Sequence, residues 1–223
     1  MRKLLFLIIG AVLIMTSCQS HAKPQANDTE SNCIGDYSVR SDTLFGGENG
    51  ESVQEISIPV LSNESFDCEK ANSLLKSAVT DYIKNCLIGN DTELRLNYEI
   101  KYMKSNRISI LFNGTVNSKL SAHPSALLFG VNIDVERGCT VPLRDLIKGE
   151  DEFEELLKQK LHEQCTPEVS DYIEKVYGQQ YLTDCLETNI YNYFYDEGSY
   201  SIIFATPHAI GDYVTIEIPF AGS

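Results

Sequence analysis

The sequence predicts an α+β fold: a mostly antiparallel sheet, a long helix packed on one face of it, and a pair of helices before the C-terminal strands. Three observations predict it. Apolar and polar residues alternate between positions 94 and 135, which is the period of half-buried strands. Apolar residues recur at three- and four-residue spacing over 71–86 and again over 153–176, which is the period of helices. Alternation returns over 191–218, so further strands follow the second helical region.

A strand and a long helix open the predicted domain. Ile56, Ile58 and Val60 alternate with polar residues, which is typical of a half-buried strand. The helix after it has a continuous apolar stripe formed by Ala71, Leu74, Leu75, Ala78, Val79, Tyr82, Ile83 and Cys86. Ser65 or Asp67 can cap its start, and Gly89-Asn90 can end it.

Long strands joined by short turns come next. Two alternating segments flank Lys104-Ser105-Asn106, which predicts a hairpin. A third strand has Leu127, Phe129, Val131, Ile133 and Val135 on one face. Glu136-Arg137-Gly138 then turns the chain into a short strand that ends at Pro142. We therefore expect an antiparallel meander with one face covered by the first helix.

Two helices and three strands complete the chain. A helical stripe starts near Glu150, with acidic residues first and lysines later, in the order that the helix dipole favours. Thr166-Pro167 marks the start of the next helix, and Gly178 marks its end. Tyrosines 191, 193 and 195 begin the final strands, and Asp196-Glu197-Gly198 forms the turn that follows them.

The N-terminus resembles a bacterial lipoprotein signal. A short basic start precedes twelve apolar residues, too few for a permanent membrane span but suited to a secretory signal. Thr16-Ser17 then places two small residues before Cys18, the expected site of lipidation. An ordinary signal peptide with a chance cysteine is the alternative. We expect an exported protein of the cell envelope, on the periplasmic or extracellular side, attached to the bilayer through an N-terminal acyl anchor.

This assignment divides the chain into three parts. Residues 1–17 form the signal peptide, and residues 18–50, which are polar and contain Gly46-Gly47, form a flexible spacer. Residues 51–223 form a single α+β domain, with subdomains 51–148 and 149–223 as an alternative.

The net charge of −14 excludes some partners and favours others. Nucleic acid selects basic surfaces, so we expect no nucleic-acid partner. An acidic body is also repelled by anionic lipid. It would attract a cationic partner through long-range steering, although the charge can equally serve solubility alone.

Six cysteines remain beside Cys18 in a chain expected to be exported. An even number permits up to three disulfides, with free buried thiols as the alternative. Cys68 and Cys86 lie at opposite ends of one predicted helix and therefore cannot pair with each other. Cys165 and Cys185 flank one helical segment and are the candidate pair.

The sequence lacks the familiar catalytic and cofactor motifs, among them GxSxG, the P-loop, GxGxxG and HExxH. We expect no cofactor, and the cysteine and histidine spacing predicts no metal site. His123, in Ala122-His123-Pro124, and His208, in Pro207-His208, lie in loops next to strands, where functional groups concentrate. Local hydrogen bonding is the plainer role for both. The tyrosine stripe at 191–195 is either a carbohydrate platform or ordinary sheet packing.

The order of these motifs resembles the extracellular domain shared by the RsiV anti-sigma factor and the peptidoglycan deacetylase PdaC, a family of unknown function. The resemblance covers roughly residues 52–220 and lies in Ile58-Pro59-Val60, Ala122-His123-Pro124, Val131-Asn132-Ile133-Asp134, Val141-Pro142-Leu143-Arg144-Asp145, Tyr193-Phe194-Tyr195, Pro207-His208-Ala209-Ile210 and Val214-Thr215-Ile216-Glu217-Ile218-Pro219. It implies an extracellular α+β sensor or wall-binding domain. In RsiV the domain binds lysozyme, a basic protein.

Three functions follow as hypotheses. The first is a non-catalytic envelope lipoprotein that binds a wall glycan or a protein such as lysozyme, through His123, Pro124, Pro207 and His208. The second is a small hydrolase of envelope glycan, in which His123 or His208 acts beside Asp134 or Asp212. The third is a structural lipoprotein that acts in complex assembly. The sequence shows no sigma-binding segment and no deacetylase domain, so we expect neither of those activities.

Overall fold

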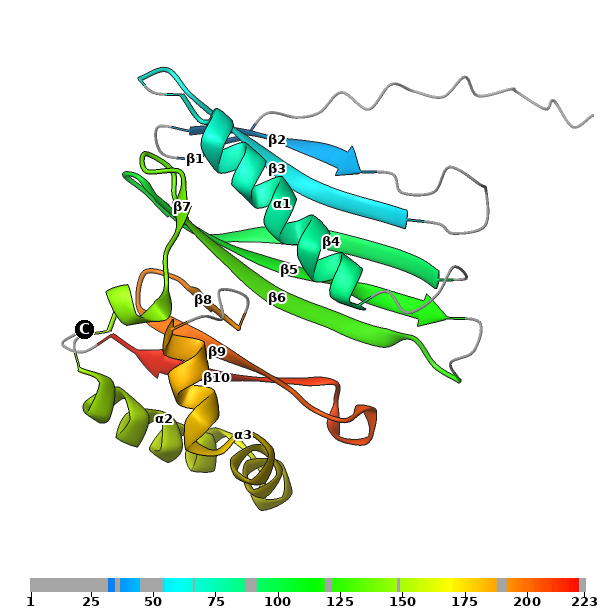
Figure 1. Ribbon diagram of the computed structural model, residues 1–223, viewed down its shortest axis with the longest axis vertical. Helices are drawn as coiled ribbons and strands as arrows, with labels where there is room; N and C mark the ends of the chain where they lie inside the picture. Colours follow the sequence, from blue (N-terminus) through cyan, green and yellow to red (C-terminus); the bar gives the residue numbers. More distant parts are fainter. Residues whose placement is uncertain are drawn as a thin grey trace, which may run out of the picture.

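The computed structural model describes residues 32–34, 37–44, 54–65, 67–86, 92–118, 122–147, 149–187 and 192–220. These residues form two sheets and three α-helices (Figure 1). The elements in chain order are β1 (Asn32–Ile34), β2 (Tyr37–Leu44), β3 (Gln54–Asn63), α1 (Glu69–Cys86), β4 (Thr92–Lys104), β5 (Arg107–Ser118), β6 (Ser125–Asp134), β7 (Cys139–Thr140), a 3-10 helix (Leu143–Asp145), α2 (Glu150–Gln164), α3 (Pro167–Glu187), β8 (Tyr193–Tyr195), β9 (Ser199–Ala205), a second 3-10 helix (His208–Ile210) and β10 (Tyr213–Pro219). The predicted α+β fold is confirmed.

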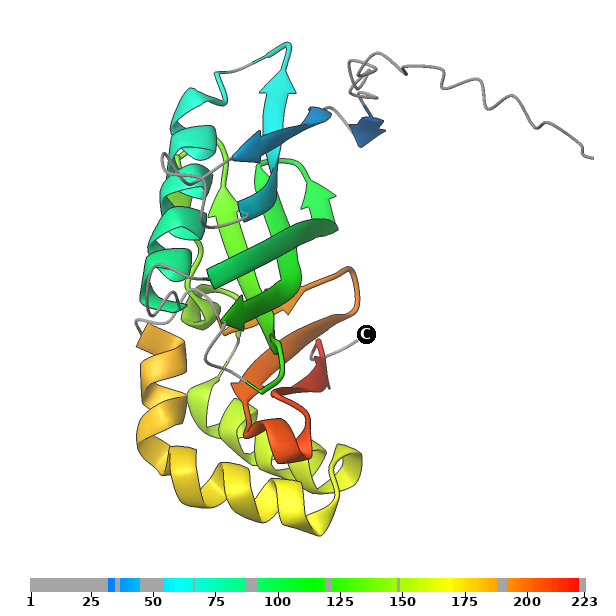
Figure 2. The same ribbon diagram turned by 90° about the vertical axis from the view of Figure 1, so that its right-hand side faces the viewer.

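The large sheet has the strand order β1-β2-β3-β4-β5-β6-β7 within the described part of the chain. Neighbouring strands are antiparallel except β3 and β4, which pair in parallel over three residues each. Helix α1 makes the crossover between these two strands and lies on one face of the sheet (Figure 2). The predicted hairpin is present, with Lys104 opposite Arg107 and a positive φ of 53° at Ser105 in the turn.

The sequence of α1 explains its position. Asp67 accepts a hydrogen bond from the N–H of Glu69 at 2.8 Å and so satisfies a donor of the first turn. From Ala71 to Ile83 the predicted stripe packs against the sheet, with Ala71, Leu75 and Val79 fully enclosed. The side-chain amide of Asn72 donates to the carbonyl of Leu61 and accepts from its N–H, both at 2.8 Å. The helix is therefore joined to β3 by packing and by paired hydrogen bonds.

The small sheet has the order β10-β9-β8 and packs with α2 and α3 around a second apolar cluster. Helix α3 begins at Pro167, as predicted, and has a kink at Gly178, where φ is 51°. The two sheets meet where β6 passes β8. There, Asn132 donates to the carbonyl of Tyr193 at 2.8 Å, and the N–H of Tyr195 donates to the hydroxyl of Ser109 at 2.9 Å.

The structure corrects two of the sequence predictions and does not describe the residues of a third. The flexible spacer predicted through residue 50 needs correction, because β2 pairs with β3 along its length and buries Tyr37 and Val39. The carbohydrate-platform alternative for the tyrosine stripe is wrong for Tyr193 and Tyr195, which are buried in the apolar cluster of the small sheet, α2 and α3. The signal peptide and the Cys18 lipidation site lie outside the described residues. Among the described helices, none is long and apolar enough to cross a membrane.

The predicted disulfide between Cys165 and Cys185 is not found among the described residues. Cys165 has a free thiol at the end of α2, packed against the apolar cluster of the small sheet, and this burial raises the pKa of the thiol. The side chain of Cys185 lies outside the described residues. Packing of Cys165 as a small hydrophobic residue accounts for its position without a bond.

Candidate functional site

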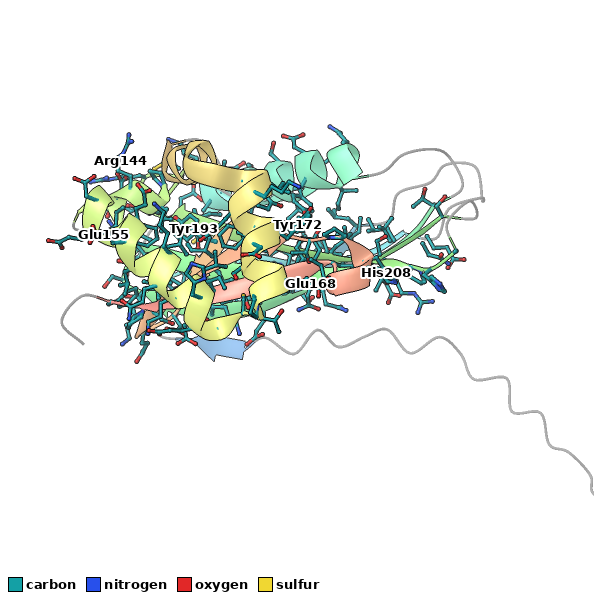
Figure 3. All side chains as sticks on the ribbon, turned by 90° about the horizontal axis from the view of Figure 1, so that it is seen from below. Arg144, Glu155, Glu168, Tyr172, Tyr193 and His208 are labelled. Atoms are coloured by element: carbon teal, nitrogen blue, oxygen red, sulfur yellow. The ribbon has the colours of Figure 1, made fainter. Side chains whose placement is uncertain are left out.

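Two loops bring His123 and His208 together at one end of the molecule. His123 precedes β6, and His208 lies in the connection from β9 to β10. Their ring centroids are 5.7 Å apart and their ring planes differ by 15°. Figure 3 shows His208 on the other side of α3 from Arg144 and Glu155. The two residues are 85 positions apart in the chain, so tertiary structure alone makes them neighbours.

The β9–β10 connection is a compact turn with unusual backbone angles. Pro207 leads into the 3-10 helix that contains His208, and Gly211 follows with a φ of 113°. Asp212 then has a φ of 60°, a left-handed conformation that Asp adopts more readily than most residues. The carbonyl of Asp212 accepts from the N–H of Thr206 at 2.7 Å, which closes the turn. This geometry directs the Asp212 side chain toward β6.

The Asp212 carboxylate joins the two loops. One oxygen lies 3.0 Å from Nδ1 of His208, and the other accepts a hydrogen bond from the N–H of Ala126 at 2.9 Å. The hydrogen bond from the N–H of Ala126 is the main cause that lowers the pKa of Asp212, and the contact with His208 lowers this pKa further. The carboxylate therefore fixes the His208 ring and attaches its loop to the start of β6.

Asp212→Asn is expected to lower the free energy of unfolding by about 1 kcal/mol at pH 7, because the amide tolerates the positive φ but has only one acceptor oxygen for two donors. The folded-state pKa of Asp212 lies below its unfolded value, so this contribution is complete above the unfolded pKa of about 4 and is lost as the pH falls through the folded value. Urea titrations at a series of pH values measure both effects.

Asp81→Asn on α1 is the matched control, because this exposed carboxylate contacts only side chains of its own helix, Ser77 at 3.3 Å and Lys84 at 3.4 Å. For the control, we expect the free energy of unfolding to change by no more than about 0.5 kcal/mol. If Asp212→Asn lowered the free energy of unfolding as much at pH 2 as at pH 7, the ionised carboxylate would not be the group that joins the loops.

The structure places the predicted residues in two separate regions. His123, Pro124, Pro207 and His208 are all exposed in the paired loops, which we call the histidine surface. Of the two candidate carboxylates, only Asp212 belongs to it. Asp134 ends β6, whose ten residues place it about 30 Å from the loop before the strand.

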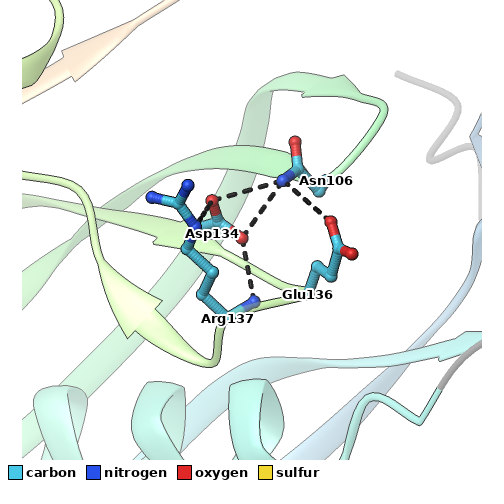
Figure 4. A network of polar contacts seen from close by, with 4 residues as sticks. All are labelled: Asn106, Asp134, Glu136 and Arg137. Carbon is cyan, nitrogen blue, oxygen red and sulfur yellow. Dashed lines mark hydrogen bonds and ion pairs between the residues drawn. The ribbon is translucent and has the colours of Figure 1, made fainter.

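Asp134 instead connects two turns of the large sheet (Figure 4). It is buried and accepts from the side-chain amide of Asn106, 3.2 Å from each of its oxygens, and from the N–H of Arg137 at 3.0 Å. Glu136 lies on the exposed side of this group, 3.4 Å from the same amide. The role of Asp134 is therefore to hold the β4–β5 hairpin against the β6–β7 turn.

The histidine surface is open rather than enclosed. The side chain of His208 is 61% exposed and that of Asp212 is 16% exposed. Among the described residues, no group of three or more His, Cys, Asp or Glu side chains is placed to hold a metal ion. The arrangement can present two imidazoles to a ligand, with one of them fixed by a carboxylate.

Two hollows lie elsewhere, and the sequence did not indicate either. One, of about 460 Å³, runs between β3 and the start of α1 and includes Asp67, Asn72 and Lys76. The other, of about 330 Å³, lies between the start of α2 and the end of β10 and is mostly apolar. Their linings come from segments distant in the chain, and the periodicity of these segments shows only that they are half-buried.

Comparison with solved structures identifies the fold. A crystal structure of a DUF3298 family member from Bacteroides fragilis matches with a TM-score of 0.50 and 15% identity, over 82% of this chain and 90% of that one. The chain shares the DUF3298 fold. A DUF3298 family protein from Pseudomonas aeruginosa also matches, with a TM-score of 0.44, 10% identity and coverage of 82% and 89%. Neither a family model nor a curated protein sequence matches the chain.

The DUF3298 domain is the one shared by RsiV and PdaC, so the resemblance noted in the sequence is confirmed as a likeness of fold. The order of elements explains why short, scattered motifs could indicate it. Ala122-His123-Pro124 leads into β6, and Pro207-His208 leads from β9 toward β10. In this chain, the folded structure therefore places two of these motifs side by side at the histidine surface.

Proposed function

We propose that this chain is a non-catalytic envelope lipoprotein whose DUF3298-fold domain binds an extracytoplasmic ligand at the histidine surface. Cys18 would bear the lipid that attaches it to the bilayer. The ligand is a basic protein such as lysozyme, or a cell-wall glycan. The observation that supports binding is the Asp212 carboxylate, which joins both loops and presents His123 and His208 side by side on an exposed surface.

Preorganisation is the physical argument for recognition. Loops that are already fixed lose little conformational entropy when they bind. Asp212 fixes these loops through two hydrogen bonds and a left-handed backbone conformation, which proteins retain mainly where the surrounding structure requires it. The exposed imidazoles and prolines then offer flat, rigid contact area to a partner.

Charge favours the basic protein over the glycan. The chain has 32 acidic and 18 basic residues, and a neutral glycan gains nothing from this excess. A cationic protein gains faster association and correct orientation from a surface of opposite charge. The proposal therefore includes a salt dependence that distinguishes the two ligands.

The His208–Asp212 pair is the observation that supports a second candidate, hydrolysis of envelope glycan. A carboxylate on Nδ1 of a histidine leaves Nε2 able to act as a general base. Glycoside hydrolysis, however, uses two carboxyl groups about 5–10 Å apart, and Asp212 already accepts two hydrogen bonds. Turnover of peptidoglycan that is lost in His208→Ala would establish this candidate in place of simple binding.

The test is retention of lysozyme and of purified peptidoglycan by the chain without residues 1–18, which keeps every described residue. We expect saturable retention of lysozyme that weakens at least about tenfold between 50 and 500 mM salt. The double variant His123→Ala, His208→Ala is expected to lose at least about tenfold in affinity.

His162→Ala is the matched control, since this exposed histidine lies on α2 and pairs with Glu174 at 3.0 Å. It should retain lysozyme as the unmodified chain does. Retention of peptidoglycan alone, independent of salt, would replace the protein ligand by the glycan. Failure to retain either would contradict the proposed function, and an affinity unaffected by the double variant would remove the histidine surface from it.

A further inference from the structure

A second surface with its own chemistry lies at the opposite end of the small sheet. It is the apolar hollow of about 330 Å³ between the start of α2 and the end of β10, which we call the α2 pocket. Its apolar wall is formed by Leu146, Ile147, Phe153, Leu156, Tyr200 and Phe220. A hollow of this size with an apolar lining and few polar groups is typical of a site that receives a small apolar group.

Aromatic rings hold the wall of the α2 pocket in place. The rings of Tyr200 and Phe220 meet edge to face with centroids 4.5 Å apart, and Phe153 meets Tyr200 in the same way at 6.3 Å. The Tyr200 hydroxyl donates to the carbonyl of Leu146. This polar group is thus satisfied within the protein, and the ring presents its apolar part to the pocket.

The charged residue in the lining of the pocket is an acid, Glu152. Asp151 and Glu155 are exposed on the same helix. None of these three carboxylates forms an ion pair with a described residue. The next acids along α2 differ, because Glu154 pairs with Lys158 and Glu163 pairs with Lys160, each at 2.6 Å. Unpaired negative charge therefore gathers at the first turns of α2, beside the opening.

We infer that the α2 pocket receives an aromatic or branched apolar side chain that lies between lysine or arginine residues on a cationic protein partner. The inference rests on the proposed function in taking the partner to be a protein. An apolar anchor in a pocket, surrounded by a polar rim, is the usual arrangement at the centre of a protein interface. The hollow beside α1 fits this chemistry less well, since Lys76 lies in its lining.

The α2 pocket is separate from the histidine surface. Phe220 directly follows β10, whereas the turn that contains His208 precedes that strand. The seven residues of β10 separate the two by about 23 Å. A large protein could contact both, but a short peptide can occupy only one. Short peptides therefore test the pocket by itself.

The experiment titrates the isotope-labelled chain without residues 1–18 with capped tripeptides and follows backbone amide shifts by NMR. We expect Lys-Phe-Lys to shift the amides around residues 146–156 and 218–220, and to bind at least about tenfold more tightly than Lys-Ser-Lys, because the phenyl ring leaves water. Glu-Phe-Glu should produce no saturable shift. Equal binding of the Phe and Ser peptides, or shifts elsewhere, would overturn the inference.

Two variants and a matched control complete the test. Glu152→Lys, at the rim, and Leu156→Trp, which fills the hollow, should each weaken Lys-Phe-Lys binding at least about fivefold. Glu168→Lys makes the same charge change at an exposed position on α3 outside the pocket and should alter affinity by less than about twofold. Should Glu152→Lys and Glu168→Lys have equal effects, only net charge would matter and the pocket would have no role.

The outcomes also separate this inference from the proposed function. Retention of lysozyme without peptide binding to the α2 pocket would contradict the inference and leave the histidine surface intact. Peptide binding without retention of lysozyme or peptidoglycan would support the pocket and contradict the proposed ligands. The double histidine variant should bind Lys-Phe-Lys unchanged, which confirms that the surfaces act independently.

Discussion

Gly130→Ala is expected to lower the free energy of unfolding by about 3 kcal/mol, because a methyl group at this position has no space. An ideal Cβ on Gly130 would lie 1.9 Å from the carbonyl oxygen of Tyr193 and 2.7 Å from its carbon. These are backbone atoms and cannot rotate away, so β6 and β8 must separate. Because the Asn132 side chain bonds to the same carbonyl, the separation also weakens that hydrogen bond. Urea unfolding followed by circular dichroism measures the loss.

Gly198→Ala is the control for this effect. A Cβ at Gly198 would lie 3.9 Å from the Asp196 carboxylate, which is an ordinary van der Waals contact. We therefore expect Gly198→Ala to change the free energy of unfolding by no more than about 0.5 kcal/mol. If the two alanine variants unfolded at the same urea concentration, the close packing of β8 on β6 would not exist in solution. Since this contact joins the two sheets, the result bears on the whole architecture.

Asp134→Ala should lower the free energy of unfolding by about 2–3 kcal/mol, since a buried acceptor of several hydrogen bonds is removed. The amide of Asn106 and the N–H of Arg137 both lose their partner, and they belong to two different turns (Figure 4). We therefore expect faster amide hydrogen exchange in both turns as well as lower stability.

Glu136→Ala provides the comparison, because this exposed carboxylate meets the same Asn106 amide at 3.4 Å. An exposed hydrogen bond of this length contributes little, so the loss should stay within about 0.5 kcal/mol. Equal losses in the two variants would mean that Asp134 is hydrated in solution rather than buried between the turns.

Periodicity predicted the elements that bury one complete face. Helix α1 and strands β4 to β6 have continuous apolar stripes against one core, and the structure confirms them. Strand β2 was missed because only Tyr37 and Val39 alternate as buried residues, while positions 40–43 are exposed at the edge of the sheet. An outer strand has little to bury, so its sequence resembles a polar loop.

The sequence could predict the residues of the histidine surface, but not that they lie together. The sequence placed His123 and His208 in loops, but the contact between the loops depends on how β6 lies relative to β9 and β10. Asp212 and Asp134 both adjoin alternating strands, and no local pattern distinguishes them. The difference arises from the left-handed turn at Asp212 and from the ten-residue length of β6, which only the folded chain reveals.

The α2 pocket had no signal in the sequence for a related reason. Leu146, Leu156 and Phe220 are half-buried residues in three different segments of the chain, and their pattern is that of ordinary core packing. A hollow appears where these three segments meet without filling the space between them. The sequence specifies each segment, but the space depends on their relative positions.

Strands β1 and β2 also limit how far the folded body could stand from a membrane. If the lipid is on Cys18, the tether ends where Asn32 enters the sheet, because β1 pairs with β2, rather than at Gln54. At about 3.4 Å per residue, the longest possible reach falls from roughly 120 Å to roughly 50 Å, whatever conformation the intervening residues adopt. With that anchor, the first two strands would confine the domain to a thin layer above the bilayer. A ligand would then have to come to that layer, because the protein could not extend far to meet it.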